Sequence, residues 1–364
     1  MGFKCGIVGL PNVGKSTLFN ALTQTAAAQA ANYPFCTIEP NIGDVAVPDP
    51  RLDRLSAIAK SAQEVPTRIT FVDIAGLVRG ASKGEGLGNQ FLANIREVDA
   101  VAHVVRCFTE GDVTHVEGRI DPVADAETVE TELMLADLES IERRIVPIEK
   151  RAKTGDKEAM LPYQLMSKAV TLLRQGKPAR EAVLTPEERE PYRRLGLLTE
   201  KPVLYVCNVD EAAAAGNAQS ARVLAMAKSQ GAGAIAISAR IEEELAQLPA
   251  GDRAEYLASL GLEEPGLNRL IRAGYDLLGL ITFFTAGPKE SRAWTVQKGA
   301  RAPQAAGVIH TDFEKGFIRA EVIKYDDYVA HGGEAGARDA GKFRLEGKDY
   351  VVQDGDVMHF RFNA

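Results

Sequence analysis

The chain has 364 residues, of which 45% are hydrophobic and 26% are charged, and its net charge is −7 at pH 7. This length predicts two or three domains with ample apolar material for packed cores. The acidic balance disfavours a protein that coats nucleic acid, so we expect no sequence-specific DNA binding, and any RNA contact requires a local basic patch. No apolar run approaches the ~18 residues that span a bilayer, and no signal peptide is recognisable. We therefore expect a cytoplasmic protein with no membrane segment.

Five short apolar runs have the character of strands that are covered on both faces. They lie at residues 3–9, 68–76, 100–108, 202–210 and 233–239. Helix-favouring segments separate them, among them 15–24 and 89–97. This alternation predicts an α/β fold with a doubly wound, mostly parallel sheet. In such sheets ligands bind beyond the carboxyl ends of the strands.

A charged, helix-favouring stretch interrupts the alternation between residues 121 and 200. Apolar residues recur there with the 4,3 spacing of a coiled coil: Met134, Leu138, Ile141, Ile145 and Ile148. Pro147 lies inside this pattern and is expected to kink or end the helix. A second apolar helix is expected over 159–173. The pattern predicts a helical hairpin arm inserted into the sheet domain, with exposed faces available to a partner.

The chain changes character near residue 280. Short strand-like runs, separated by glycine-rich turns, are predicted at 281–284, 292–296, 317–323, 350–352 and 357–362, with a helix at 305–311. This composition predicts a small α+β domain of about 85 residues. The expected parts are thus a discontinuous nucleotide-binding domain (1–120 and 201–279), the inserted helical arm (121–200) and a C-terminal domain (280–364).

A phosphate-binding motif follows the first predicted strand. The run Gly9-Leu10-Pro11-Asn12-Val13-Gly14-Lys15-Ser16-Thr17 matches G-x-x-x-x-G-K-[ST] between a strand and a helix. Its glycines allow backbone N–H groups to face a phosphate, and the helix N-terminus adds partial positive charge. We expect Lys15 to reach the outer phosphates and Ser16 to offer its hydroxyl to Mg²⁺. The fold is therefore predicted to be that of a P-loop NTPase.

Two further residues are candidates for the metal site. Asp73 ends a predicted strand in Asp73-Ile74-Ala75-Gly76, where its carboxylate would hold Mg²⁺ through water and the Gly76 N–H would sense the γ-phosphate. Thr37 lies in a loop after the first helix, where a threonine ligates Mg²⁺ when the γ-phosphate is present. This arrangement argues against a P-loop kinase.

The base-reading segment is expected at Asn208-Val209-Asp210-Glu211, where GTPases carry Asn-Lys-x-Asp. Val209 replaces the lysine, and the longer carboxylate of Glu211 would overshoot guanine. Asn208 can serve the N6 and N7 atoms of adenine, as asparagine does in DNA. Ser238-Ala239 matches the remaining base-loop signature. We therefore favour ATP over GTP, with relaxed specificity for both nucleotides as the alternative.

The residue that positions the attacking water is not the usual one. Ras-type GTPases place a glutamine directly after the D-x-x-G motif, whereas this chain has Leu77. Water must then be oriented by another side chain, a monovalent cation or a partner. His115 is the side-chain candidate, and slow intrinsic turnover is expected.

Three blocks of this sequence resemble the YchF subfamily of the Obg-related P-loop proteins, the Obg-like ATPases. The first is the phosphate loop itself. The others are Asn32-Tyr33-Pro34-Phe35-Cys36-Thr37-Ile38-Glu39-Pro40-Asn41 and Asp73-Ile74-Ala75-Gly76-Leu77-Val78-Arg79-Gly80-Ala81-Ser82-Lys83-Gly84-Glu85-Gly86-Leu87-Gly88-Asn89. The resemblance extends over essentially the whole chain. It includes the helical arm and a C-terminal β-grasp TGS domain, to which 281–362 is similar.

The resemblance implies an ATPase that associates with the ribosome, either its large subunit or the 70S particle, through the TGS domain and the arm. It implies Mg²⁺ bound by Ser16 and Thr37, phosphate contacts from Asn12 to Thr17, and base contacts near Asn208 and Val209. We expect a monomer.

Catalytic features are also implied. A hydrophobic residue in the glutamine position is a trait of the family, which Leu77 fits, and the family's proposed catalytic histidine corresponds to His115. Asn12 matches the P-loop asparagine associated with potassium activation in related proteins, so K⁺ is a further candidate ion. The sequence departs from the family's pattern at Arg79, where many relatives have lysine, and this small difference does little to weaken the resemblance.

Three functions compete. The first is an ATP-hydrolysing switch that docks on the ribosome and regulates translation or the stress response. The second is a non-catalytic regulator that acts by protein contacts and has incidental slow ATPase activity. The third is a true GTPase, against which Glu211 argues.

Overall fold

The computed structural model describes residues 3–30, 41–74, 87–108 and 120–363. It divides into two compact units, one formed by 1–44 and 70–270 and the other by 45–69 and 271–364. Each unit is described by itself. Among the residues described, no helix is long and apolar enough to cross a bilayer.

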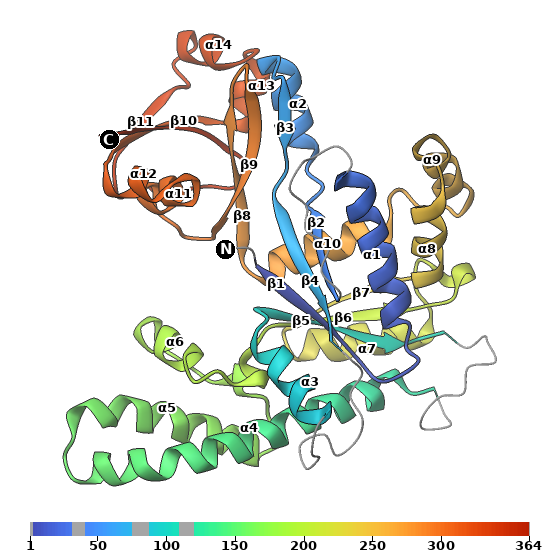
Figure 1. The fold of residues 1–364 in the computed structure, drawn as a ribbon, viewed down its shortest axis with the longest axis vertical. Coiled ribbons are helices and arrows are strands. Elements are labelled where there is room, and N and C mark those ends of the chain that lie inside the picture. The colour runs from blue at the N-terminus through green and yellow to red at the C-terminus, as the bar shows by residue number, and fades with distance from the viewer. Residues whose placement is uncertain (1–2, 31–40, 75–86, 109–119, 364) are drawn as a thin grey trace. The chain divides into compact units, whose positions relative to one another are not determined.

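The first unit is built on a six-stranded sheet (Figure 1). Its strands, in spatial order, are β2 (Ile42–Ala46), β4 (Arg68–Asp73), β1 (Lys4–Val8), β5 (Ala100–Arg106), β6 (Val203–Asn208) and β7 (Gly233–Ile237). The pairs β1–β4, β1–β5, β5–β6 and β6–β7 are parallel. The predicted strands and parallel sheet are confirmed. The order reverses at β1, so a crevice for ligands is expected at its carboxyl end.

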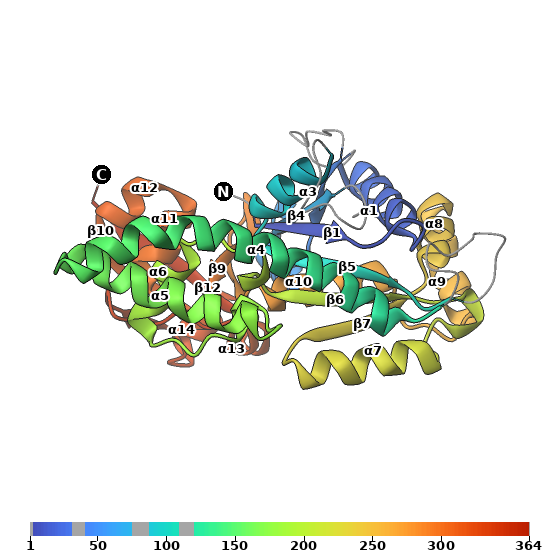
Figure 2. The ribbon, with the colours of Figure 1, turned by 90° about the horizontal axis from the view of Figure 1, so that it is seen from below.

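Helices cover both faces of this sheet, with α1 on one face and α3, α4 and α7 on the other (Figures 1 and 2). Ala126 of α4 and Val223 of α7 pack with Tyr205 and Cys207 of β6 in one buried cluster. The helices and 3₁₀ turns are α1 (Lys15–Ala30), α3 (Leu87–Arg96), α4 (Pro122–Lys153), α5 (Lys157–Arg174), η1 (Ala179–Glu181), α6 (Pro186–Arg193), η2 (Leu198–Glu200), η3 (Glu211–Ala213), α7 (Ala218–Ser229), α8 (Ala239–Gln247) and α9 (Ala250–Ser259).

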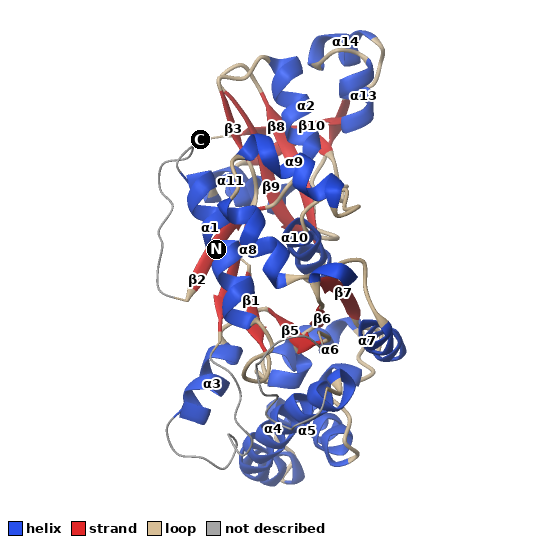
Figure 3. Ribbon diagram, turned by 90° about the vertical axis from the view of Figure 1, so that its right-hand side faces the viewer, coloured by secondary structure: helices blue, strands red, loops and turns tan. Residues whose placement is uncertain are grey.

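The predicted helical hairpin is present as α4 and α5, which lie side by side (Figure 3). Ile141 is fully buried between them, and the other seam residues pack around it. Of the two outcomes expected at Pro147, an end of the helix is wrong, because α4 continues to Lys153, and a kink stays a prediction. A proline forfeits one backbone hydrogen bond, and the packing of Ile145 and Ile148 on either side stabilises the helix across that gap.

Asp137 of α4 binds the backbone of η2, the 3₁₀ turn that follows the helical arm. Its buried carboxylate accepts hydrogen bonds from the backbone N–H groups of Leu198 and Thr199, both at 2.8 Å, and from the Thr199 hydroxyl at 2.7 Å. The Thr199 hydroxyl in turn accepts from the Ala179 N–H at 3.0 Å. Charged hydrogen bonds of this kind offset the cost of burying the carboxylate.

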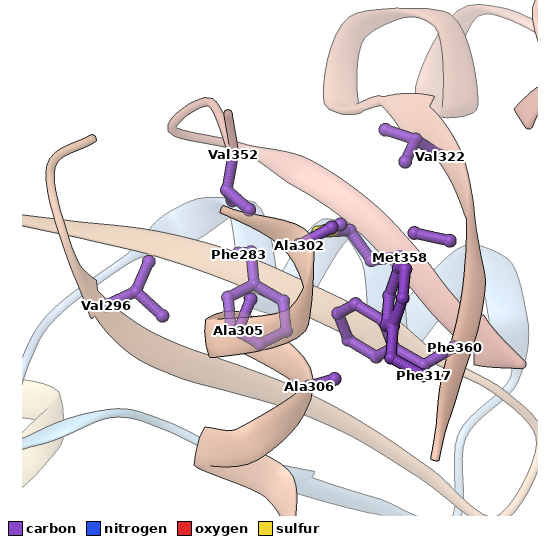
Figure 4. Packing of buried hydrophobic residues seen from close by; sticks show 11 residues of the cluster. Phe283, Val296, Ala302, Ala305, Ala306, Phe317, Val322, Val352, Met358 and Phe360 are labelled. Atoms are coloured by element: carbon purple, nitrogen blue, oxygen red, sulfur yellow. The ribbon is translucent and has the colours of Figure 1, made fainter. Parts of the chain in front are cut away.

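The second unit contains another six-stranded sheet, in the order β11, β10, β12, β8, β9, β3. Its strands are β3 (Gln63–Val65), β8 (Leu280–Ala286), β9 (Glu290–Gln297), β10 (Phe317–Lys324), β11 (Arg344–Glu346) and β12 (Asp356–Phe362). Strands β8 and β12 are parallel at the centre, flanked by antiparallel neighbours. Helix α11 (Ala302–Ile309) packs on one face over Phe283 and Phe360 (Figure 4). This is the predicted β-grasp arrangement.

Three local features of this unit differ from the sequence-based expectation. Residues 350–352 form no strand but a single bridge between Val351 and Arg301. The predicted helix is two helices, α11 and α12 (Thr311–Lys315). Short helices α13 (Tyr325–Ala330) and α14 (Glu334–Asp339) occupy a segment expected to be turns. Helices of five or six residues are too short for periodicity to reveal.

The segment 45–69 belongs to the second unit, although it precedes that unit's other strands by more than two hundred residues. Helix α2 (Pro50–Ala59) buries Leu52 and Leu55 against Phe284 and Ala293, and β3 pairs in parallel with β9. The sequence-based division placed this segment in the nucleotide-binding domain. That three-part division stays a prediction.

Candidate nucleotide-binding site

The phosphate loop joins β1 to α1 through three residues with positive φ: Gly9 (154°), Asn12 (62°) and Gly14 (94°). A Cβ at Gly9 would lie 2.4 Å from the Val104 carbonyl oxygen, so only glycine fits there. Helix α1 begins at Lys15. Its first N–H groups have no partner within the helix and carry partial positive charge, which makes the loop a binding site for anions.

Lys15 is held against this loop. Its side chain is buried, and Nζ donates to the Leu10 carbonyl at 3.0 Å. Burial lowers the pKa of the Lys15 ammonium, and the negative charge of Asp73 partly offsets this shift. The Lys15 ammonium therefore lies next to the phosphate loop, where a bound phosphate would accept its hydrogen bond in place of the Leu10 carbonyl.

Asp73 ends β4 with one side-chain oxygen unpaired. Its Oδ1 is buried without a hydrogen-bond partner among the residues described. Burial raises the pKa of Asp73, and the Lys15 ammonium acts in the opposite direction. Ser16 lies exposed on the first turn of α1. A carboxylate oxygen without a partner and an exposed hydroxyl are both ligands that suit Mg²⁺, a hard ion that keeps several waters and shares phosphate oxygens.

No group of three His, Cys, Asp or Glu side chains that could hold a metal by itself occurs in the described part of the chain. The remaining predicted residues of this region, Thr37, Gly76, Leu77 and His115, lie outside the described residues, and their roles stay predictions.

Asn208 connects the base side of the site to the phosphate loop. Its Nδ2 donates to the Val13 carbonyl at 3.0 Å, and its Oδ1 accepts from the Ala239 N–H at 3.0 Å. A Cβ on Gly14 would lie 2.2 Å from that same Nδ2. Asn208 is buried, and its amide positions two loops around the pocket; its predicted contact with adenine stays a prediction.

Val209 and Ser238 have structural roles as well as positions in the pocket wall. Val209 is buried in the cluster beneath β6. Ser238 caps the N-terminus of α8, accepting from the Ile241 N–H at 3.5 Å. Residues predicted from separate motifs therefore meet at one place.

The phosphate loop and the segments that follow β6 and β7 line one pocket of about 1040 Å³. Its walls are formed by Asn12, Gly14, Lys15, Ser16, Thr17, Phe108, Asn208, Val209, Asp210, Glu211, Ala212, Ala213, Ser238, Ala239 and Arg240. The volume is ample for a nucleotide, for which pockets of ~300–1,000 Å³ are usual. Sequence reasoning missed Phe108 and Arg240. Phe108 follows the end of β5, where ligands bind in such sheets, and Arg106 stacks over its ring at 4.3 Å.

The fold and this site define a P-loop nucleotide-binding protein of the GTPase type. The family model MMR_HSR1, described as 50S ribosome-binding GTPase, matches residues 4–146. The model YchF-GTPase_C, described as a protein of unknown function (DUF933), matches residues 280–363.

Curated relatives named ribosome-binding ATPase YchF align over their whole length. Those of Haemophilus influenzae and Bacillus subtilis are 60% and 54% identical, covering 100% of this chain and of each relative. The solved YchF GTPase of Schizosaccharomyces pombe is 39% identical with a TM-score of 0.89, covering 99% of this chain and 98% of that one. The chain belongs to the YchF family, as its sequence blocks predicted.

Proposed function

We propose that this chain is an ATPase that binds the ribosome and uses ATP hydrolysis as a molecular switch. The observation that carries the proposal is the pocket in which Lys15 and the Asn208-bridged loops converge, with the charge of Asp73 acting on the Lys15 ammonium. The printed names of its relatives, which combine ribosome binding with ATPase activity, support it.

The choice of nucleotide is the point on which the relatives' descriptions differ, since the fission-yeast structure is described as a GTPase. Val209 and Glu211 replace the lysine and aspartate with which GTPases recognise guanine. ATP is therefore the proposed substrate, and true GTPase activity is the alternative.

In the proposed reaction, Ser16 and Thr37, with Asp73 through water, would hold Mg²⁺, which would supply positive charge that neutralises the phosphates. Lys15 moves its hydrogen bond from Leu10 to the outer phosphates. Leu77 cannot orient water, so His115 is proposed for that role, with K⁺ at Asn12 as an accessory ion.

The proposed partner surfaces are the arm formed by α4 and α5 and the C-terminal β-grasp domain, which is proposed to be a TGS domain. The protein is proposed to act in the cytoplasm as a monomer. A regulator that acts by contact alone would need the same surfaces but not the nucleotide.

Two measurements test this function. Side-by-side titration with ATP and GTP should show tighter binding and faster turnover of ATP; a preference for GTP would establish the alternative. Co-sedimentation with purified ribosomes should change with the bound nucleotide. If Lys15→Ala abolishes nucleotide binding but leaves ribosome association and its cellular effect unaltered, the switch is refuted in favour of the contact regulator.

A further inference from the structure

An ion pair spans the base end of the nucleotide pocket. Arg240 Nε lies 2.6 Å from Oε1 of Glu211, and both residues belong to the pocket wall. Glu211 opens η3, directly after β6, and Arg240 is the second residue of α8. The pair therefore connects the two loops that face the base.

The backbone holds both partners in place. Asn208 fixes the Ala239 N–H beside it, and Ser238 caps the same helix turn. Arg240 also lies 3.8 Å from Glu244, one helical turn further along α8. Glu244 accepts a hydrogen bond from the Tyr256 hydroxyl. The guanidinium thus stands between two carboxylates, and the nearer one is Glu211.

The pair has a consequence for base choice. A guanine base offers N1–H and N2–H₂ as donors, which need a free carboxylate, whereas adenine has the acceptor N1 and a C2–H at these two positions. A carboxylate already paired with a guanidinium is a poorer acceptor for a second donor and is directed away from it. Guanine then lacks the Glu211 carboxylate as an acceptor for its N–H groups. Adenine is not repelled, because the negative charge of Glu211 is neutralised by Arg240.

We propose that Arg240 is a specificity-determining residue, which favours ATP over GTP by holding the Glu211 carboxylate at the rim of the pocket. This inference rests on the proposed function, because it concerns the same pocket and the same nucleotides. It adds Arg240, which directly follows the Ser238-Ala239 signature and is not part of it.

The test is the ratio of dissociation constants for GTP and ATP, measured by titration of the full-length chain. Arg240→Gln should lower this ratio about fivefold, the largest change expected from one exposed ion pair, about 1 kcal/mol. Arg222→Gln is the matched control, since Arg222 pairs with Asp121 at 3.1 Å outside the pocket; it should leave the ratio unchanged.

A double-mutant cycle separates action through Glu211 from direct contact with the base. In a Glu211→Gln background, Arg240→Gln should no longer change the ratio. If the change persists there, or if Arg240→Gln leaves the ratio of the parent chain unaltered, the inference is overturned.

Ionic strength gives a second readout. Salt screens an exposed pair, and both nucleotides carry the same charge, so raising the salt concentration should lower the GTP-to-ATP ratio in the parent chain and not in Arg240→Gln. Equal salt dependence in both chains would contradict the inference. A parent chain that prefers GTP or binds neither nucleotide would instead defeat the proposed function, so the two failures are distinguishable.

Discussion

The side-chain amide of Asn208 donates a hydrogen bond to the backbone carbonyl of Val13 at 3.0 Å, across 195 residues of sequence. This contact joins the end of β6 to the phosphate loop and fits only because Gly14 lacks a side chain. The geometry of the phosphate site thus depends on the base side of the pocket.

Gly14→Ala should abolish nucleotide binding while leaving the chain folded. The new Cβ would lie 2.2 Å from Asn208 Nδ2, at a φ of 94° that side chains rarely adopt, so the loop or the amide must move. Gly155→Ala is the control, because its φ is 86° but no atom lies within 4 Å. It should cost about 1–2 kcal/mol of stability and keep nucleotide affinity, as measured by titration.

Asp73→Asn should stabilise the nucleotide-free chain and impair its metal binding. Since the folded-state pKa of Asp73 is raised by burial, the ionised carboxylate lowers stability above its unfolded pKa of 3.8, and this penalty disappears as pH falls. The melting temperature of the variant should therefore be higher at neutral pH but not near pH 3.

The same variant should require about 10- to 100-fold more Mg²⁺ for hydrolysis, as is typical when a residue that acts on a metal through water is lost. Asp252→Asn, an exposed change on α9, serves as the control. Equal Mg²⁺ requirements in the two variants would show that Asp73 is not part of the metal site.

His103 should make the protein sensitive to acid. Burial, followed by the charges of Lys15 and Arg180, lowers the pKa of this β5 histidine from 6.5 to about 3. Between pH 6.5 and about pH 3, His103 is protonated in the unfolded chain but neutral in the folded chain. Stability should therefore fall by about 1.4 kcal/mol for each pH unit below about 6.5.

His103→Phe should remove this part of the acid slope in urea unfolding experiments at several pH values. The control variant His331→Gln, a change at an exposed histidine, should keep this acid slope. A slope that is unaffected by His103→Phe would show that other groups cause the acid sensitivity.

Leu55→Ala tests whether 45–69 is an integral part of the second unit. Leu55 is fully buried in a cluster with Phe284 and Tyr328, so its truncation should cost about 2–5 kcal/mol of unfolding free energy. Leu345→Ala, a 56% exposed change in the same unit, should cost less than about 0.5 kcal/mol. Similar small losses for both in chemical denaturation would refute the assignment.

Local patterns in the sequence were enough to predict several features of this protein. The phosphate loop, the strands of the parallel sheet and the seam of the helical hairpin each follow from residue types at short, regular spacing. A helix end at Pro147 and a strand at 350–352 were expected wrongly, because packing rather than local propensity decides there whether an element continues or forms.

The contacts between distant segments became visible in the folded chain alone. Folding turned Asn208 into a bridge to Val13, brought Arg240 to Glu211, and added α2 and β3 to the C-terminal sheet. The physical reason is that such contacts depend on how twisted sheets and packed helices place backbones in space. Residues that are far apart in the chain carry no local pattern that records their meeting.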